Sequence, residues 1–277
     1  MVVSLLPPPR QWSRYQIESS LTQRMIQLQH QQHSQTRLRW GLMDAIGPGI
    51  CRVCIETLSR QHRQPLLMYQ LSDDLESVMR ELVFRTDEQG ELQAVLNLNQ
   101  LQREWALRGH DLRRKYSRLP QAHVLFGAFE TGLRTGVSLL KGYQHRCPHG
   151  LVQAGIWGHY STQTGVVVSR VIPDFFNQLA LPLVVERWLE QDGQDWVLRG
   201  RGSLDTDRFD GDSFRRQMRQ AVNMYNLDVE MAVSYEEEYR LSGVSKRLLG
   251  GRQWLRAEAC DVYEHESEHR LVLSEEL

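Results

Sequence analysis

The stretch from residue 229 to 241 reads VEMAVSYEEEYRL, and its apolar side chains recur at every second position. The apolar members are Val229, Met231, Val233, Tyr235, Tyr239 and Leu241. Most residues between them are polar, including several glutamates. A period of two is typical of a β-strand with one buried and one exposed face. The segment therefore predicts a long strand whose glutamate-rich face is a solvent or partner surface.

The residues just before this strand predict a helix. Asp210 or Asp212 can cap its first turn. Its apolar stripe consists of Phe214, Met218, Ala221, Val222 and Tyr225. Because elements that follow each other in the chain tend to pack together, we expect this helix on the buried face of the strand.

The same two patterns recur along the rest of the chain. Alternating segments separated by turn signals predict strands within the first 70 residues, a further short strand at 66–69, and hairpins at 82–96 and 183–199. A helix capped by Asp73 is expected after residue 72, and two longer helices are expected at 97–116 and 120–140. We expect an α+β protein in which curved antiparallel β-sheets carry a few packed amphipathic helices.

A glycine- and histidine-rich segment at 144–164 divides the chain into two stretches of similar content. We expect an N-terminal antiparallel meander with helices at 1–143 and a C-terminal antiparallel sheet with one helix at 144–277. The two stretches can also form one continuous domain. This similarity could reflect a diverged internal duplication, but few residues are identical between the two stretches, so coincidence accounts for it at least as well.

Composition narrows the function classes. The formal net charge is −1, which gives no reason to expect a nucleic acid or an anionic membrane as the main partner. No apolar run is long enough to predict a membrane span, and the first ten residues do not resemble a signal peptide. We therefore expect a cytoplasmic protein with reduced thiols at its four cysteines.

Two short motifs have the spacing of a zinc site and of a redox site, but the segments around them do not have the structure that these sites require. His265-Glu-Ser-Glu-His269 has the letters of the helical zinc motif, but strand-like segments flank it, so we expect a hairpin tip without zinc. Cys51-Arg-Val-Cys54 has the spacing of a redox motif, but it lies within an expected strand. Residues three apart in a strand point to opposite faces, so we expect buried structural cysteines without a mutual disulfide.

The segment at 145–149 is the candidate metal site. His145, Cys147 and His149 place two imidazoles and one thiol within five residues of an expected loop. Imidazole and thiolate are suitable ligands for zinc or copper. A solvated loop without metal is the alternative.

No catalytic motif lies in its expected context, and no cofactor is predicted. We therefore expect a non-enzymatic interaction or assembly protein, such as an adaptor or structural component, whose partner is another protein or a larger complex. The first alternative is a carrier or sensor for an apolar small molecule, held in a cavity between sheet and helices. The second alternative is a metal-dependent hydrolase.

Overall fold

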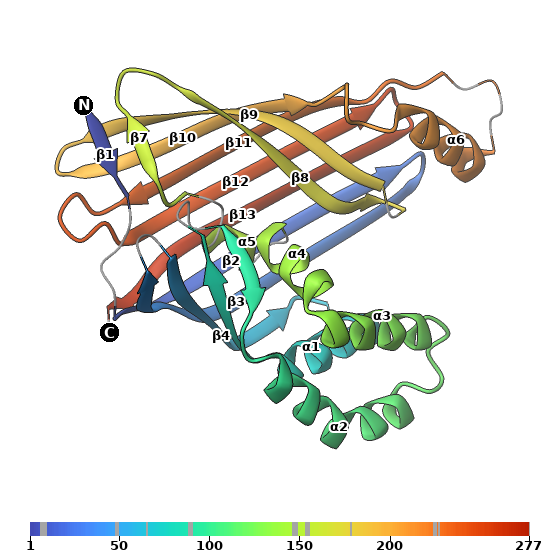
Figure 1. Ribbon diagram of the computed structural model, residues 1–277. Coiled ribbons are helices and arrows are strands. Elements are labelled where there is room, and N and C mark those ends of the chain that lie inside the picture. Colours follow the sequence, from blue (N-terminus) through green and yellow to red (C-terminus); the bar gives the residue numbers. More distant parts are fainter. Residues whose placement is uncertain are drawn as a thin grey trace.

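A computed structural model describes residues 1–5, 10–47, 50–64, 66–87, 91–145, 149–152, 156–177, 179–223, 226 and 228–276. Eleven strands form one antiparallel sheet in the order β6-β5-β4-β3-β2-β13-β12-β11-β10-β9-β8 (Figure 1). Their bounds are β2 (Gln11–Met25), β3 (Leu28–Gly47), β4 (Ile50–His62), β5 (Glu81–Thr86), β6 (Leu92–Val95), β8 (Val166–Phe176), β9 (Leu179–Asp192), β10 (Asp195–Leu204), β11 (Ala232–Leu241), β12 (Leu248–Ala259) and β13 (Tyr263–Glu276). A separate two-stranded sheet pairs β1 (Val2–Ser4) with β7 (His159–Ser161).

The centre of the large sheet joins two segments that lie far apart in the sequence. β2 pairs with β13, from Met25 opposite Tyr263 to Ser13 opposite Glu276. Strands of both expected stretches, 1–143 and 144–277, thus belong to one sheet. Within the described residues no sheet closes or is strongly curled. The expected antiparallel α+β architecture is confirmed, whereas the curvature, the duplication and the division at residue 143 stay predictions.

The helices form two groups (Figure 1). The first group follows β4 or β6 in the sequence and consists of α1 (Leu67–Val78), α2 (Leu98–Lys115), α3 (Ala122–Thr135), α4 (Val137–His145) and the short α5 (His149–Val152). The second is α6 (Gly211–Val222), which lies at the far end of the sheet. None of the helices in the described part of the chain is both long and apolar enough to cross a membrane.

Two hydrophobic clusters form the core. The larger one packs α1 to α5 against β2 to β5 and extends to the inner sides of β9 to β13. The smaller one packs Phe214 and Met218 of α6 against Tyr235 of β11 and Leu255 of β12. The expected packing of this helix on the strand is therefore confirmed, although β11 begins at Ala232 and not at Val229. Ala221 of the expected stripe is exposed, and Tyr225 lies outside the described residues.

Local patterns predict most elements but misplace two boundaries. The short strand expected at 66–69 is wrong, because α1 begins at Leu67 and buries Leu71, Leu75 and Val78 at helical spacing. Asp73 therefore lies inside α1, where its carboxylate contacts His62 Nε2 at 3.1 Å instead of capping the helix. The helix expected at 120–140 is divided at Gly136, whose φ of 73° ends α3 in the left-handed region that glycine tolerates.

Candidate functional site

The inward side of β11 carries three large polar side chains: Tyr235, Glu237 and Tyr239. Each lies over a glycine of a neighbouring strand. A Cβ added to Gly200 would lie 2.8 Å from Glu237 Cγ, and one added to Gly251 would lie 2.9 Å from Tyr239 Cδ1. Such distances are shorter than any normal contact. The glycines therefore provide the space in which these side chains lie flat on the sheet.

Glu237 is the centre of a buried ion cluster. Its side chain is 0 % exposed, and those of Arg170 and Arg187 are 8 % and 5 % exposed. Arg170 Nη1 donates to Oε2 at 2.8 Å, and Arg187 Nε donates to Oε1 at 2.5 Å. Tyr235 Oη also donates to Oε2, at 2.8 Å. Both carboxylate oxygens thus accept charge-assisted hydrogen bonds, which a buried ion requires.

The protonation states of the cluster follow from these contacts. Burial opposes ionisation of Glu237, but the guanidiniums of Arg187 and Arg170 outweigh it and hold its pKa below the ordinary value. Burial raises the pKa of Tyr235 well above its ordinary value, so its phenol stays protonated and can donate to the carboxylate. The cluster is therefore a carboxylate held by two cations and a neutral hydroxyl.

Glu237 belongs to a row of cross-strand partners that traverses eight strands, from β9 to β4. In order, this polar row consists of Arg187, Gly200, Glu237, Gln253, His269, Ser19, Ser34 and His62. Every member except Gly200 is polar. On one side of the row lie residues of the larger core cluster, such as Leu271, and on the other side residues of the smaller cluster, such as Leu255. Arg187, Glu237 and Gln253 of the row are buried, whereas His269, Ser19, Ser34 and His62 are half-buried. The buried polar groups are costly unless they find hydrogen-bond partners.

The expected hairpin tip at His265–His269 is wrong, because the segment lies inside β13 between β12 and β2. In a strand, His265 and His269 point to the same side but are separated by about 13 Å of chain, at about 3.3 Å per residue. One metal ion cannot bind both rings at that separation, so the helical zinc arrangement is not formed. Both histidines instead face inward, His269 as a member of the polar row and His265 beside it, and Glu266 and Glu268 face outward.

Both histidine rings are neutral near pH 7. Burial lowers the pKa of His265 to about 4, and burial together with the nearby His265 and Arg170 lowers that of His269 to about 4. Each Nδ1 has a partner: Gln23 Nε2 lies 3.1 Å from that of His265, and Ser19 Oγ lies 2.9 Å from that of His269. The described residues provide no hydrogen-bond partner for either Nε2 atom.

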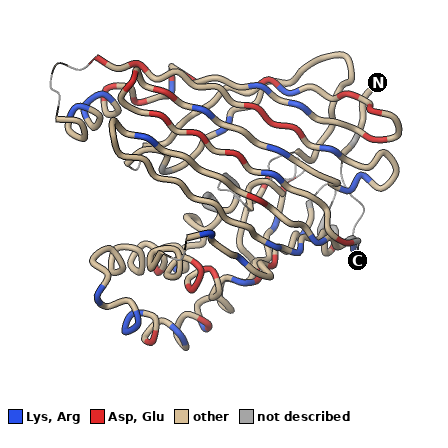
Figure 2. Tube along the Cα trace, turned by 180° about the vertical axis from the view of Figure 1, so that it is seen from behind, with Lys and Arg blue, Asp and Glu red and all other residues tan. Residues whose placement is uncertain are grey.

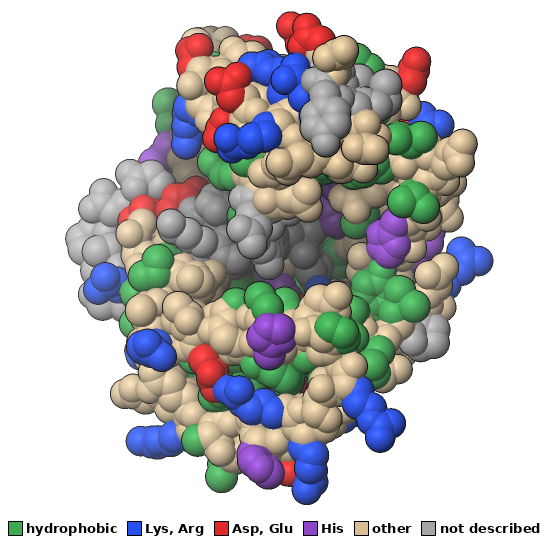
Figure 3. Space-filling model, turned by 90° about the vertical axis from the view of Figure 1, so that its right-hand side faces the viewer, with side chains coloured by type: hydrophobic (Ala, Val, Ile, Leu, Met, Phe, Trp, Pro, Cys, Tyr) green, Lys and Arg blue, Asp and Glu red, His purple; other side chains and the backbone are tan. Residues whose placement is uncertain are grey.

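A cavity of about 280 Å³ adjoins these rings. Its polar lining includes Arg170, Gln253, His265 and His269, and its apolar lining includes Leu21, Ile172, Pro173, Phe175 and Leu255. With Tyr235 of β11, the lining comes from β2, β8, β11, β12 and β13, so the pairing of these strands assembles the site. In the view of Figure 3, the surface is hollowed between its upper and lower parts, and hydrophobic and histidine side chains lie at the rim.

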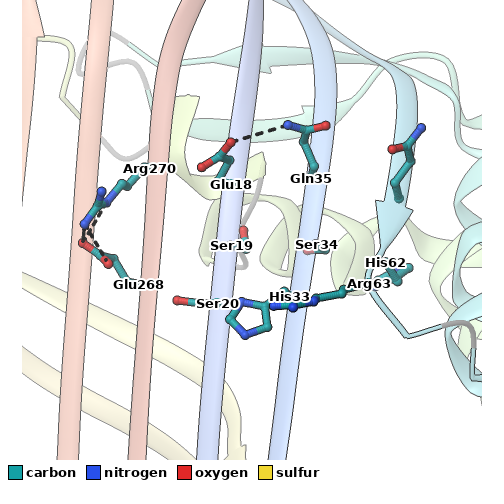
Figure 4. Close-up of a pocket in the computed structure, with 11 residues that line it drawn as sticks. Glu18, Ser19, Ser20, His33, Ser34, Gln35, His62, Arg63, Glu268 and Arg270 are labelled. Carbon is teal, nitrogen blue, oxygen red and sulfur yellow. Dashed lines mark hydrogen bonds and ion pairs between the residues drawn. The ribbon is translucent and has the colours of Figure 1, made fainter.

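A second hollow of about 600 Å³ lies over β13, β2, β3 and the C-terminal end of β4 (Figure 4). Its outward-facing lining includes Glu18, Ser20, His33, Gln35, Glu268 and Arg270. These charges already pair with each other or with neighbours: Arg270 lies 2.9 Å from Glu268, which also accepts from Arg252 at 2.7 Å. Arg270 is 62 % exposed. This hollow is a solvated ion-pair surface, and its chemistry selects no ligand.

The candidate metal ligands at 145–149 are only partly described. His145 ends α4, and its side chain and the whole of Cys147 lie outside the described residues. His149 begins α5 and is buried, with Nε2 3.0 Å from Thr57 Oγ1. Burial, with a smaller contribution from Arg60, lowers the pKa of His149 to about 3. Within the described residues no three His, Cys, Asp or Glu side chains form a metal-binding group. The metal site stays a prediction.

The cysteine prediction is confirmed for the residues it concerns. Cys51 and Cys54 lie in β4, both have free thiols, and Cys54 is buried while Cys51 is half-buried. Cys51 packs against the larger core cluster together with Val53 and Ile55. By strand alternation Cys54 points to the other face. Burial raises the pKa of the Cys54 thiol to about 12, so this thiol is not a nucleophile near neutral pH.

Sequence reasoning missed the ion cluster, although one signal was present. Glu237 occupies an odd-numbered position in the 229–241 segment. The remaining odd-numbered residues of this segment are all apolar, and the alternation predicts that they are buried. A charged residue in a buried row indicates an internal partner of opposite charge. Its partners Arg170 and Arg187 lie 67 and 50 residues away, so no local pattern identifies them.

Comparison with known proteins does not assign the chain to a family. No family model matches the chain, and no curated protein matches it.

Proposed function

We propose that the protein is a cytoplasmic carrier or sensor that binds a small molecule in the cavity beside the polar row. The observation that carries the proposal is the mixed lining of this cavity. Apolar side chains such as Ile172, Phe175 and Leu255 meet hydrogen-bonding groups of Arg170 and His265 within about 280 Å³. Binding sites for small molecules combine a mostly apolar wall with a few convergent polar groups in this way.

The energetics of the lining support an occupant. His265 is buried and His269 is half-buried, and the described residues offer no hydrogen-bond partner for either Nε2 atom. A molecule that fills the cavity displaces water from these atoms and can form hydrogen bonds with them, which provides affinity.

Native mass spectrometry of protein purified from its own host tests the proposal. We expect an adduct of fixed mass that is released on denaturation. The matched variants are Ser267→Phe, which places a ring in the cavity, and Ser20→Phe, which places the same ring on the outward face of β2. Loss of the adduct in Ser267→Phe alone supports the proposal, and protein without an adduct contradicts it.

The expectation of an adaptor or structural component that binds another protein stays a prediction, and so does the metal-dependent hydrolase. Affinity purification from the native host tests the adaptor hypothesis, because a stable partner would be recovered in stoichiometric amount.

A further inference from the structure

The chemistry of the cavity lining also specifies a class of ligand, if the proposed function holds. We propose that the ligand is a small organic acid with an apolar body, whose carboxylate lies against Arg170 and His265. The inference rests on the donors that line the cavity, on the absence of acidic groups among its described lining residues, and on the apolar part of its lining.

His265 presents a donor to the cavity. Gln23 Nε2 lies 3.1 Å from His265 Nδ1, and an amide nitrogen donates but does not accept hydrogen bonds. Nδ1 is therefore the acceptor, and the neutral ring carries its proton on Nε2. His265 is only 8 % exposed, so this N–H meets little solvent, and an acceptor atom of a ligand can take the place of water there.

The charge of the lining favours an anion. Among the described lining residues, Arg170 is the one residue with a charged side chain, and none is acidic. Glu237, which pairs with Arg170, is shared with Arg187 and does not line the cavity. A carboxylate presents two acceptor oxygens, which match the donors of a guanidinium and of an imidazole N–H. An ammonium group would be repelled by the guanidinium charge of Arg170.

The rest of the lining favours a short apolar body. Leu21, Ile172, Pro173, Phe175 and Leu255 provide the apolar part of the lining, and the Phe175 ring packs against His265 with centroids 4.6 Å apart. A volume of about 280 Å³ lies at the lower end of the range of roughly 300–1,000 Å³ for ligand sites. The cavity therefore suits a chain of moderate length rather than a large lipid.

Calorimetric titration of the full-length protein with three probes of equal chain length tests this inference at pH 7.5. The probes are octanoate, octanol and octylamine, which differ in the head group alone. We expect octanoate to bind at least ten-fold more tightly than octanol, and octylamine to bind most weakly. Equal or tighter binding of octanol overturns the inference, and so does binding of none of the three. The proposed function is judged separately, by the co-purified adduct, so the two failures are distinguishable.

A variant pair locates the head group. His265→Phe keeps an aromatic ring but removes the donor, so we expect octanoate affinity to fall at least ten-fold while octanol affinity stays within about two-fold. His33→Phe makes the same change on the outward face of β3 and should alter neither affinity. An unchanged octanoate preference in folded His265→Phe overturns the assignment. If that variant does not fold, the three probes on the unaltered protein still decide between acid and alcohol.

Discussion

Three consecutive glutamates of β11 lie on opposite faces of the sheet, so they allow the two faces to be compared directly. Glu236 and Glu238 point outward with side chains 50 % and 53 % exposed, whereas the side chain of Glu237 between them is 0 % exposed. On the outward face, Arg199 lies 3.1 Å from Glu238 in contact with water. On the inward face, Arg187 lies 2.5 Å from Glu237 with solvent excluded. The pairs have the same chemical groups and differ in their surroundings.

This difference determines what each face can do. Residues with charges of both signs lie along successive strands (Figure 2). Where their side chains point outward, water screens them and each pair contributes little. Inward charges have lost their water, so each depends on its partners, and their fields reach further. The outward face therefore supports solubility and strand register. The inward face can recognise a ligand, because its groups are few, fixed and desolvated.

Neutralising Glu237 should have the largest effect of any single substitution. Glu237→Gln leaves Arg170 and Arg187 buried around an uncharged amide, and breaking a buried ion pair typically costs about 3–5 kcal/mol. Urea unfolding measures the loss. The matched variants Glu236→Gln and Glu238→Gln should change the free energy of unfolding by no more than about 0.5 kcal/mol. Similar losses at all three positions would show that the two faces do not differ as described.

Acid should destabilise the protein through the two histidines of the inward face. The pKa values of His265 and His269 are about 4 in the folded protein and near 6.5 when exposed, so the unfolded chain binds more protons between these values. Stability is fully present above pH 6.5 and falls as the pH drops towards 4, by about 3 kcal/mol for each histidine. Urea unfolding at pH 7, 5.5 and 4 measures this. His265→Phe should flatten the profile and His110→Gln, on exposed α2, should not; identical profiles would contradict the burial of His265.

The glycine opposite Glu237 offers a steric test of intermediate size. Gly200→Ala places a methyl group 2.8 Å from Glu237 Cγ and Oε1, and the rigid ion cluster cannot move aside easily. Overpacking of this kind costs about 1–3 kcal/mol. Arg201→Ala, at the next and outward position of β10, should cost much less. Thermal unfolding compares the two, and an unchanged melting temperature for Gly200→Ala would mean that the cluster tolerates displacement.

The sequence predicts what depends on neighbours in the chain. The alternation at 229–241 predicts β11 and its buried face, and Asp210 predicts the start of α6, where its side chain accepts a hydrogen bond from Ser213 N. The antiparallel hairpins follow from the same reasoning, because the two strands and the turn are contiguous.

The sequence does not predict what depends on distant strands. His265–His269 resembles a turn until β2, some 240 residues earlier in the chain, provides the strand beside it. The polar row cannot be read from the sequence, because its members share only their register across eight strands. A one-residue shift between β13 and β2 would turn Ser19 away from His269, so the candidate site is a property of pairing rather than of a motif.

The smallest effect on the free energy of unfolding is expected for the outward ion pairs. A coupling energy near zero would show directly that water screens this face. A double-mutant cycle with Arg199→Ala and Glu238→Ala isolates the energy of that pair from the other contacts of each side chain. Both side chains are about half exposed, at 47 % and 53 %, so we expect a coupling of no more than about 0.5 kcal/mol that decreases in 1 M salt. The unfolding free energies of the wild type, both single variants and the double variant provide the measurement. A coupling above about 2 kcal/mol, or one insensitive to salt, would mean that this face is shielded from water by a covering partner. In that event the outward face, and not the cavity, would become the first place to search for the function of the protein.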